Sequence, residues 1–216
     1  MYSKAIFDDE CRACPRLACF LDDVKQQYPH YYCRPVSPFG DDNPHLLIVG
    51  LAPGLHGANA TGRPFTQDYA GILLYEALYE FGFSNQINSE FLGDGLVLTG
   101  CRITNAVKCL PPQNKPTGIE INQCNHYLAA ELTTLAENAV ILALGSIAHL
   151  AVLKAFNLKQ STLKFAHNTT HPLSCGHVLV DSYHTSRYNV QTNRLTKDMF
   201  TDVFITIKEL LTKIDT

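Results

Sequence analysis

Three polar segments of the chain carry most of the residue types that can do chemistry. Residues 50–71 are rich in glycine and contain one carboxylate, Asp68, while residues 105–113 begin with Asn105 and residues 184–193 begin with His184. A carboxylate and an imidazole can each transfer protons, and an amide offers both a donor and an acceptor. A glycine-rich loop lets the backbone approach a ligand closely. These segments therefore predict a binding or catalytic site.

The eight cysteines raise the question of metal binding. Cys11 and Cys14 form a C-x2-C pair, which presents two thiolates to one metal or cluster, and Cys109 and Cys124 follow later in the chain. Their spacing leaves three interpretations open: unrelated buried thiols, a tetrahedral zinc site and a cubane iron–sulfur cluster. We expect the remaining cysteines to be structural: Cys19, Cys33, Cys101 and Cys175.

The elements that position these segments follow from the apolar pattern. Runs of apolar, often β-branched residues predict buried strands at residues 45–49, 101–107, 139–144 and 177–182. Helical spacing predicts helices at residues 69–81, 117–137, 146–156 and 197–213. Strands that alternate with helices predict an α/β domain with a central parallel sheet between helices. Ligands bind such sheets beyond the carboxyl ends of the strands, where the three polar segments begin, so we expect one composite site.

Length and composition favour a single globular domain. The chain has 216 residues, 46% of them hydrophobic, and a formal net charge of -3. No apolar run is long enough to span a membrane and charges interrupt residues 1–20, so we expect no secretory signal and a cytoplasmic location. Between Asn138 and Lys197 the only acid is Asp181. Such a stretch suits a phosphate partner, although ordinary surface variation gives the same pattern.

Four motifs occur in a characteristic order: GLAPG at residues 50–54, TGRPF at 61–65 followed by Asp68, NAVKC at 105–109 and HTSRYN at 184–189. Together they resemble the uracil-DNA glycosylase superfamily. Three further stretches resemble family five: HGAN at residues 56–59, the FT-x-D-x-x-G end of the loop, and HxSRxN-x-x-T-x-RLT at 184–196. Leu51 stands where family four usually has an acid. The resemblance extends from about Cys11 to the last predicted helix.

The resemblance implies a fold and a cofactor. It implies one glycosylase-like domain over residues 1–216, a three-layer sandwich with a central four-stranded, mostly parallel sheet. A cluster-binding segment of about residues 1–40 would pack on this domain. The resemblance also implies a [4Fe-4S] cluster bound by Cys11, Cys14, Cys109 and Cys124, with zinc as the less favoured occupant.

The resemblance also implies an activity. A monofunctional DNA glycosylase would flip uracil, or another deaminated base such as hypoxanthine or xanthine, out of DNA and hydrolyse its N-glycosidic bond, which initiates base excision repair. We expect a monomer that acts on DNA without membrane attachment. Two alternatives stay open. One is a non-catalytic damaged-DNA-binding module that retained the fold and the cluster. The other is a small-molecule phosphate or nucleotide enzyme, which the lack of a Walker lysine and of a GxGxxG sequence disfavours.

Three catalytic residues match the family motifs. Asp68 would stabilise positive charge on the sugar, His184 would donate to a carbonyl oxygen of the base, and Asn105 would recognise a base edge. Each residue also has a structural alternative: Asp68 as a helix cap, His184 as a buried structural histidine and Asn105 as a turn residue.

The same motifs imply contacts with the base and with DNA. Phe65 would stack on the flipped base, although core packing is its alternative. Tyr188 would wedge into the duplex, while Arg187 and Arg194 would meet phosphates. Arg63 would either contact phosphate or brace the loop. The expected binding residues are Leu51, Ala52, Gly54, His56, Asn59, Arg63, Phe65, Ser186, Arg187, Tyr188 and Asn189.

Three positions depart from the family pattern. Thr185 replaces a proline, Ala60 an arginine and Gln67 a glycine. These departures bear on the substrate range more than on the reaction class.

Overall fold

Four parallel strands form the centre of a six-stranded sheet in this computed structural model, which describes residues 7–212. They are β2 (Leu46–Gly50), β3 (Cys101–Asn105), β4 (Val140–Leu144) and β6 (Val178–Ser182). Two short strands, β1 (Phe39–Gly40) and β5 (Thr170–Pro172), pair antiparallel with β3 and β6, which gives the order β1-β3-β2-β4-β6-β5. The predicted α/β fold is confirmed, with two edge strands added to the four that the sequence predicts.

The parallel strands end at a common edge because their registers align. Gly50 of β2 pairs with Asn105 of β3, and Leu144 of β4 pairs with Ser182 of β6. The last residues of all four strands therefore open on the same side of the sheet, where a ligand site of this architecture is expected.

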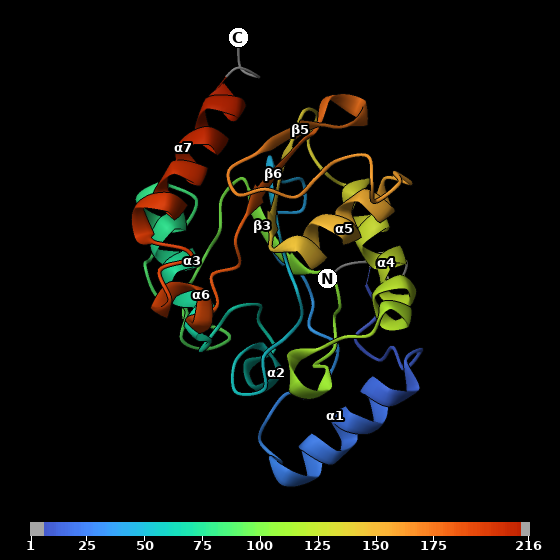
Figure 1. Cartoon of the computed structure of the whole chain (residues 1–216). Helices are drawn as coiled ribbons and strands as arrows, with labels where there is room; N and C mark the ends of the chain where they lie inside the picture. The colour runs from blue at the N-terminus through green and yellow to red at the C-terminus, as the bar shows by residue number, and fades with distance from the viewer. Residues whose placement is uncertain (1–6, 213–216) are drawn as a thin grey trace.

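Helices cover both faces of the sheet, which explains why every residue of β2, β3 and β4 is buried. As Figure 1 shows, α3 (Tyr69–Glu80) and α7 (Lys197–Thr212) lie on one side, and α4 (Gly118–Leu132) and α5 (Ser146–Ala155) lie on the other. Alternate strand residues enter the two cores. Ile48 packs in the core under α3 and α7, whereas Leu47 packs in the core under α4 and α5.

The predicted helices begin where their caps indicate, but one ends early. The Thr117 hydroxyl and the Glu120 carboxylate form a capping box at the start of α4. This helix ends at Leu132 instead of continuing to residue 137. Thr133 and Thr134 direct their hydroxyls to carbonyls of the preceding turn, and Asn138 has a left-handed φ of 56°. These local bonds favour turns over further helix.

The N-terminal segment contains a helix that sequence patterning did not reveal, α1 (Pro15–Gln27). It lies at one end of the molecule beside the four-residue helix α2 (Ala58–Thr61), as Figure 1 shows. Leu17 of α1 packs on Val107 and Tyr127, and Arg16 donates two hydrogen bonds of 2.7 Å to the Glu120 carboxylate. Within residues 7–212, no helix combines the length and the apolar character needed to cross a membrane.

Candidate active site

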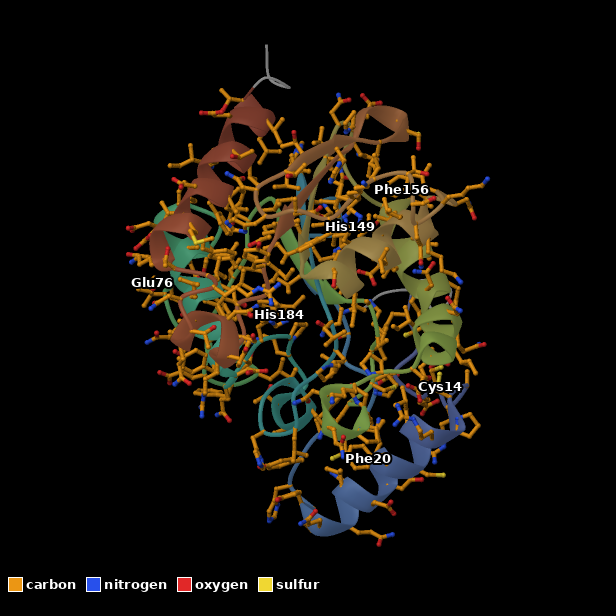
Figure 2. The ribbon with its side chains drawn as sticks, in the orientation of Figure 1. Cys14, Phe20, Glu76, His149, Phe156 and His184 are labelled. Atoms are coloured by element: carbon orange, nitrogen blue, oxygen red, sulfur yellow. The ribbon has the colours of Figure 1, made fainter. Side chains whose placement is uncertain are left out.

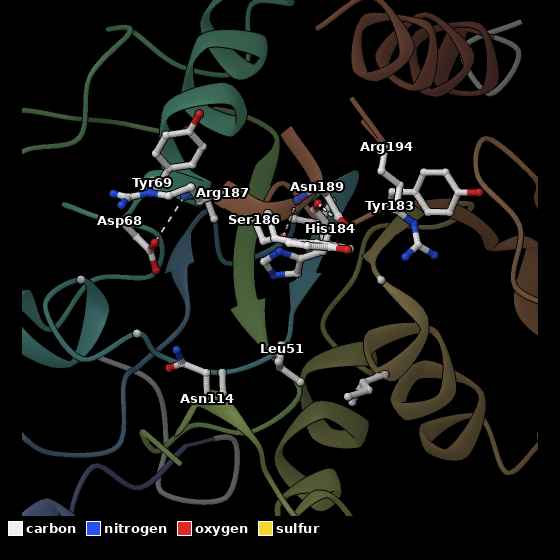
Figure 3. Close-up of a pocket in the computed structure, with 18 of the residues that line it drawn as sticks. Leu51, Asp68, Tyr69, Asn114, Tyr183, His184, Ser186, Arg187, Asn189 and Arg194 are labelled. Carbon is white, nitrogen blue, oxygen red and sulfur yellow. Dashed lines mark hydrogen bonds between the residues drawn. The ribbon is translucent and has the colours of Figure 1, made fainter. Parts of the chain in front are cut away.

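A cleft of about 740 Å³ opens at the carboxyl edge of the four parallel strands. The segments after β2, β3, β4 and β6 all contribute to its lining, with residues 51–52 and 54–57, Asn114, residues 144–147, and residues 183–184 and 186–189 respectively. Figure 3 shows Asp68 and His184 facing this cleft, with Leu51 and Asn114 across from them. Two of the three polar segments, residues 50–71 and 184–193, thus meet in this cleft, whereas the stretch after β3 reaches it only with Asn114, just beyond residues 105–113.

Asp68 both caps a helix and faces the cleft. Its Oδ1 accepts a hydrogen bond of 3.3 Å from the Ala70 N–H at the start of α3. A methyl group on Gly54 would lie 2.7 Å from Asp68 Oδ2, and one on Gly57 would lie 2.9 Å from Asp68 Cβ. The glycines of this loop therefore make room for Asp68 itself. Asp68 can cap the helix and face the cleft at the same time, because only Oδ1 of its carboxylate bonds to the helix.

His184 extends the loop after β6 into the cleft. Its Nδ1 is buried and has no hydrogen-bond partner among residues 7–212. Burial lowers the pKa of His184, while the Asp68 carboxylate opposes that shift. The imidazole is thus neutral at neutral pH and can donate one hydrogen bond. Its ring stacks on Phe65, with the centroids 6.2 Å apart and the planes 27° apart.

Ser186 and Asn189 hold the loop that bears His184. Ser186 caps α6 (Arg187–Gln191), where its Oγ accepts from the Asn189 N–H at 3.4 Å. The Asn189 side chain donates to the His184 carbonyl oxygen at 2.8 Å. Both residues line the cleft and also fix the backbone around His184.

Asn105 and Phe65 form a buried wall behind the cleft. Asn105 is only 3% exposed at the end of β3. A methyl group on Gly50 would lie 2.5 Å from Asn105 Oδ1 and 2.6 Å from Phe65 Cζ, so glycine at this position lets the two side chains meet. Phe65 has a left-handed φ of 58°, which orients its ring toward His184.

Three expected binding residues do not line the cleft: Phe65, which belongs to the buried wall, and Arg63 and Asn59, whose contacts are structural. Arg63 is 2% exposed, and its guanidinium binds Asp94, Thr66 and Ser89. This saturated guanidinium has no nitrogen left for a phosphate, which corrects the DNA-binding prediction and favours the bracing alternative. Asn59 is fully buried and donates to Cys33 Sγ at 3.5 Å, so it too is removed from the cleft surface.

The rim of the cleft carries cations supported by aromatic rings. The Arg187 guanidinium lies 5.0 Å from the centroid of Tyr69, and that of Arg194 lies 4.9 Å from the centroid of Tyr183. Tyr188 is 70% exposed on α6. His56 also lines the cleft and is held by a 2.8 Å hydrogen bond between its Nδ1 and the Tyr31 hydroxyl.

Sequence reasoning missed several lining residues, above all Gly145 and Ser146. They follow β4, and Gly145 adopts φ 91° and ψ 163°, a conformation that glycine accepts. Together they expose the N-terminus of α5, whose free N–H groups favour anions. The rule that ligands bind beyond strand ends would have found them. Phe165, in an irregular segment, and Asn114, at the end of a short 3-10 helix, also line the cleft, but neither carries a comparable signal.

Four cysteines converge at a second, small and mostly apolar cavity near α1 and α4. Cys11, Cys14, Cys109 and Cys124 line it, and the Lys108 N–H donates to Cys124 Sγ at 3.3 Å. Burial raises the pKa of Cys124 to about 11, and burial together with the neighbouring thiols raises the pKa of Cys109. Such thiols ionise readily only beside a cation, so the donor set suits a thiolate-ligated metal centre.

Comparison with known proteins identifies the family of the chain. Residues 37–208 match the family model described as the Uracil DNA glycosylase superfamily. A type-5 uracil-DNA glycosylase from Thermus thermophilus is 45% identical over 205 residues, which cover 93% of each chain. A type-5 uracil-DNA glycosylase from Pyrobaculum aerophilum is 41% identical over 197 residues, which cover 89% of this chain and 85% of that one.

A solved structure shares the fold. The crystal structure of SMUG2 from Pedobacter heparinus superposes with a TM-score of 0.50 over 88% of this chain and 83% of that chain, at 15% identity. The motifs, the fold and the relatives agree: the chain belongs to the uracil DNA glycosylase superfamily, among the type-5 uracil-DNA glycosylases.

Proposed function

We propose that this protein is a uracil-DNA glycosylase that hydrolyses the N-glycosidic bond of a flipped nucleotide. The observation that carries the proposal is the meeting of a carboxylate and a neutral imidazole at one cleft, Asp68 and His184, with the Phe65 ring stacked on His184. A cleft of about 740 Å³ lies in the range of small-molecule pockets and admits an extruded nucleotide.

Base recognition would rest on the buried wall. The flipped base would stack at Phe65, a contact worth about 1–3 kcal/mol. Asn105 would present its amide to the base edge from the end of β3. Deaminated purines such as hypoxanthine and xanthine present a carbonyl like that of uracil, and we include them in the proposed substrate range.

Bond cleavage develops charge at two places that the cleft can serve. As the C1′–N bond breaks, negative charge grows on the base, where neutral His184 would donate a hydrogen bond to a carbonyl oxygen. Positive charge grows on the sugar, where Asp68 would stabilise it and orient a water. The water oxygen would bond to C1′, its proton would leave through solvent or Asp68, and the base would depart, leaving an abasic site.

The rim would bind DNA. Arg187 and Arg194 would contact phosphates, and the exposed ring of Tyr188 would fill the gap that the flipped base leaves. His56 also lines the cleft and would contact the bound strand. No lysine lines the cleft among residues 7–212, in keeping with a monofunctional enzyme without a Schiff-base step.

The converging cysteines would hold a [4Fe-4S] cluster. Four thiolates from the start of the chain, from the segment after β3 and from α4 would tie the N-terminal segment, about residues 1–40, to a single domain. A cluster so placed, away from the cleft, would supply structural stability rather than reaction chemistry. Anaerobically purified protein should be brown and contain about four iron atoms per chain. Colourless protein with bound zinc would overturn the assignment.

The activity is tested by incubating the protein with oligonucleotides that contain uracil, hypoxanthine or xanthine, in single- and double-stranded form. Alkali-labile sites in uracil-containing DNA are expected, with their loss in Asp68→Asn and His184→Gln. Asp198→Asn, an exposed carboxylate on α7, is the matched control. No strand cleavage from any deaminated base would refute the proposal. Tight binding of such DNA without release, unchanged in Asp68→Asn, would instead support the non-catalytic module.

A further inference from the structure

A group of three titratable side chains lies buried behind the cleft and takes no part in the proposed reaction. Asp181 of β6 is fully buried, as is His149 of α5, and His171 of β5 is 7% exposed. His149 Nδ1 lies 2.8 Å from Asp181 Oδ1, and His171 Nε2 lies 3.1 Å from Asp181 Oδ2. Figure 2 shows the position of His149 on α5.

The hydrogen-bond partners of His149 determine its protonation. Its Nε2 lies 3.0 Å from the Leu163 carbonyl oxygen, which can only accept, so Nε2 carries a hydrogen. Its Nδ1 faces a carboxylate that also receives a hydrogen bond from His171 and is therefore best satisfied when ionised. Both ring nitrogens of His149 must then donate, which makes this buried side chain an imidazolium. In agreement, Asp181 raises the pKa of His149 against the opposing effect of burial.

The surroundings of His149 add no competing charge. Within residues 7–212, the titratable groups at His149 are Asp181 of β6, which bonds it, and His171 of β5, whose ring centroid lies 5.5 Å from that of His149. The segment between α5 and β5 contributes the Leu163 carbonyl and the ring of Phe165, whose centroid lies 5.8 Å from that of His149. Lys164, on the same segment, is exposed to solvent.

This pair supports one wall of the cleft. The Leu163 bond anchors the segment that carries Phe165, a cleft-lining ring that also contacts Tyr183. Asp181 holds the far end of that segment through its backbone, which bonds Asn168 and Thr169. One turn before His149 on α5 lies Gly145, whose carbonyl accepts the His149 N–H at 3.1 Å.

We propose that His149 is a proton-dependent positioning residue: its imidazolium, paired with Asp181 and braced by His171, holds the Phe165 wall in the form that binds DNA. When the imidazolium loses a proton, Nδ1 keeps the hydrogen that faces the Asp181 carboxylate and Nε2 gives up its own. The Leu163 hydrogen bond is then lost, which frees the segment of residues 163–169. The proposal about substrate binding rests on the glycosylase function proposed above, whereas the protonation of His149 does not.

The sign of the pH effect follows from the raised pKa. Since the folded protein holds this proton more tightly than the unfolded chain, the stabilisation is complete below the ordinary histidine pKa of about 6.5 and disappears as the pH rises through the folded value. KM for uracil-containing DNA should therefore rise on the alkaline side, while kcat changes little.

The decisive test needs no activity. Ring-nitrogen NMR of the wild-type protein should show His149 with both nitrogens protonated at pH 7, and with neutral imidazole only at higher pH. Asp181→Asn should convert it to a neutral tautomer at pH 7. A neutral His149 in the wild-type protein would overturn the proposal. So would zinc bound to the wild-type protein and lost in Asp181→Asn, since a metal would then occupy the place of the proton.

Kinetics separate positioning from a purely structural role. Asp181→Asn should raise KM at pH 7 about tenfold, toward the alkaline value of the wild type, with kcat within about twofold. Asp198→Asn should keep the wild-type profile. Equal losses of kcat and kcat/KM, or an unchanged KM profile, would refute the positioning role. Should Asp181→Asn fail to fold, His149→Gln and the wild-type NMR titration still decide the question.

Discussion

Substituting Gly54 by alanine offers a sharp test of the Asp68 assignment. The new methyl group would lie 2.7 Å from Asp68 Oδ2, so the carboxylate must move by roughly 0.7 Å to reach an ordinary contact of 3.4 Å. Misplacing a catalytic group by about 1 Å can cost about 100-fold in rate. We therefore expect Gly54→Ala to lower kcat by about 10- to 100-fold. Stability should hardly change, because the side chain that moves ends in a flexible carboxylate.

The assay is single-turnover release of uracil from duplex DNA, alongside thermal unfolding. Gly118→Ala is the matched control, since a methyl group there meets nothing within 4 Å, and it should keep full activity. The double variant Gly54→Ala/Asp68→Asn should be no slower than Asp68→Asn alone if the effect acts through Asp68. A normal kcat in folded Gly54→Ala, or fully additive losses in the double variant, would refute the reasoning.

Further predictions concern strain, burial and charge. Gln67→Gly should stabilise the protein by about 0.5 kcal/mol in urea unfolding, because Gln67 has a left-handed φ of 55°; a loss of stability would contradict this. Thr185→Val should add about 1 kcal/mol, since Oγ1 is buried without a partner among residues 7–212; a decrease would reveal a bonded hydroxyl. Arg63→Gln should cost about 3 kcal/mol by leaving Asp94 unpaired, yet keep the salt dependence of KM, whereas Arg187→Gln should weaken that dependence. Because Arg63 holds the pKa of Asp94 well below its usual range, the gap in unfolding free energy between wild type and Arg63→Gln should narrow as the pH falls below about 4.

The sequence predicted the central strands well because their patterning is strong. The clearest are β2 and β4, short apolar runs that are buried on both faces, as the core positions of Leu47 and Ile48 show. The edge strands have two and three residues, too few for any periodicity. Helix α1 has a modest apolar face whose partners, such as Val107, lie about ninety residues away in the chain, so its packing cannot be read locally.

In the candidate site, too, residues with a local sequence signal were predicted and residues that depend on distant partners were not. Motif order brought Asp68 and His184 to one cleft, since both follow strands of the sheet. The predicted phosphate contact of Arg63 was wrong because its guanidinium binds Asp94, which lies in an irregular segment 31 residues later. No local sequence pattern predicts such a partner. Gly145 was missed for a different reason. It shapes the cleft through its backbone conformation at the end of a strand and has no reactive side chain.

The two outer strands have a consequence beyond the architecture of the site. An exposed sheet edge is a template on which another chain can pair, leading to domain swapping or fibrous aggregation. Here β1 offers two residues and β5 three, and Pro172 of β5 has no N–H to donate. Neither edge presents a row of hydrogen-bonding groups long enough to recruit a strand. When many copies gather along DNA, as the proposed DNA-binding rim implies, their sheets therefore have no edge by which to join.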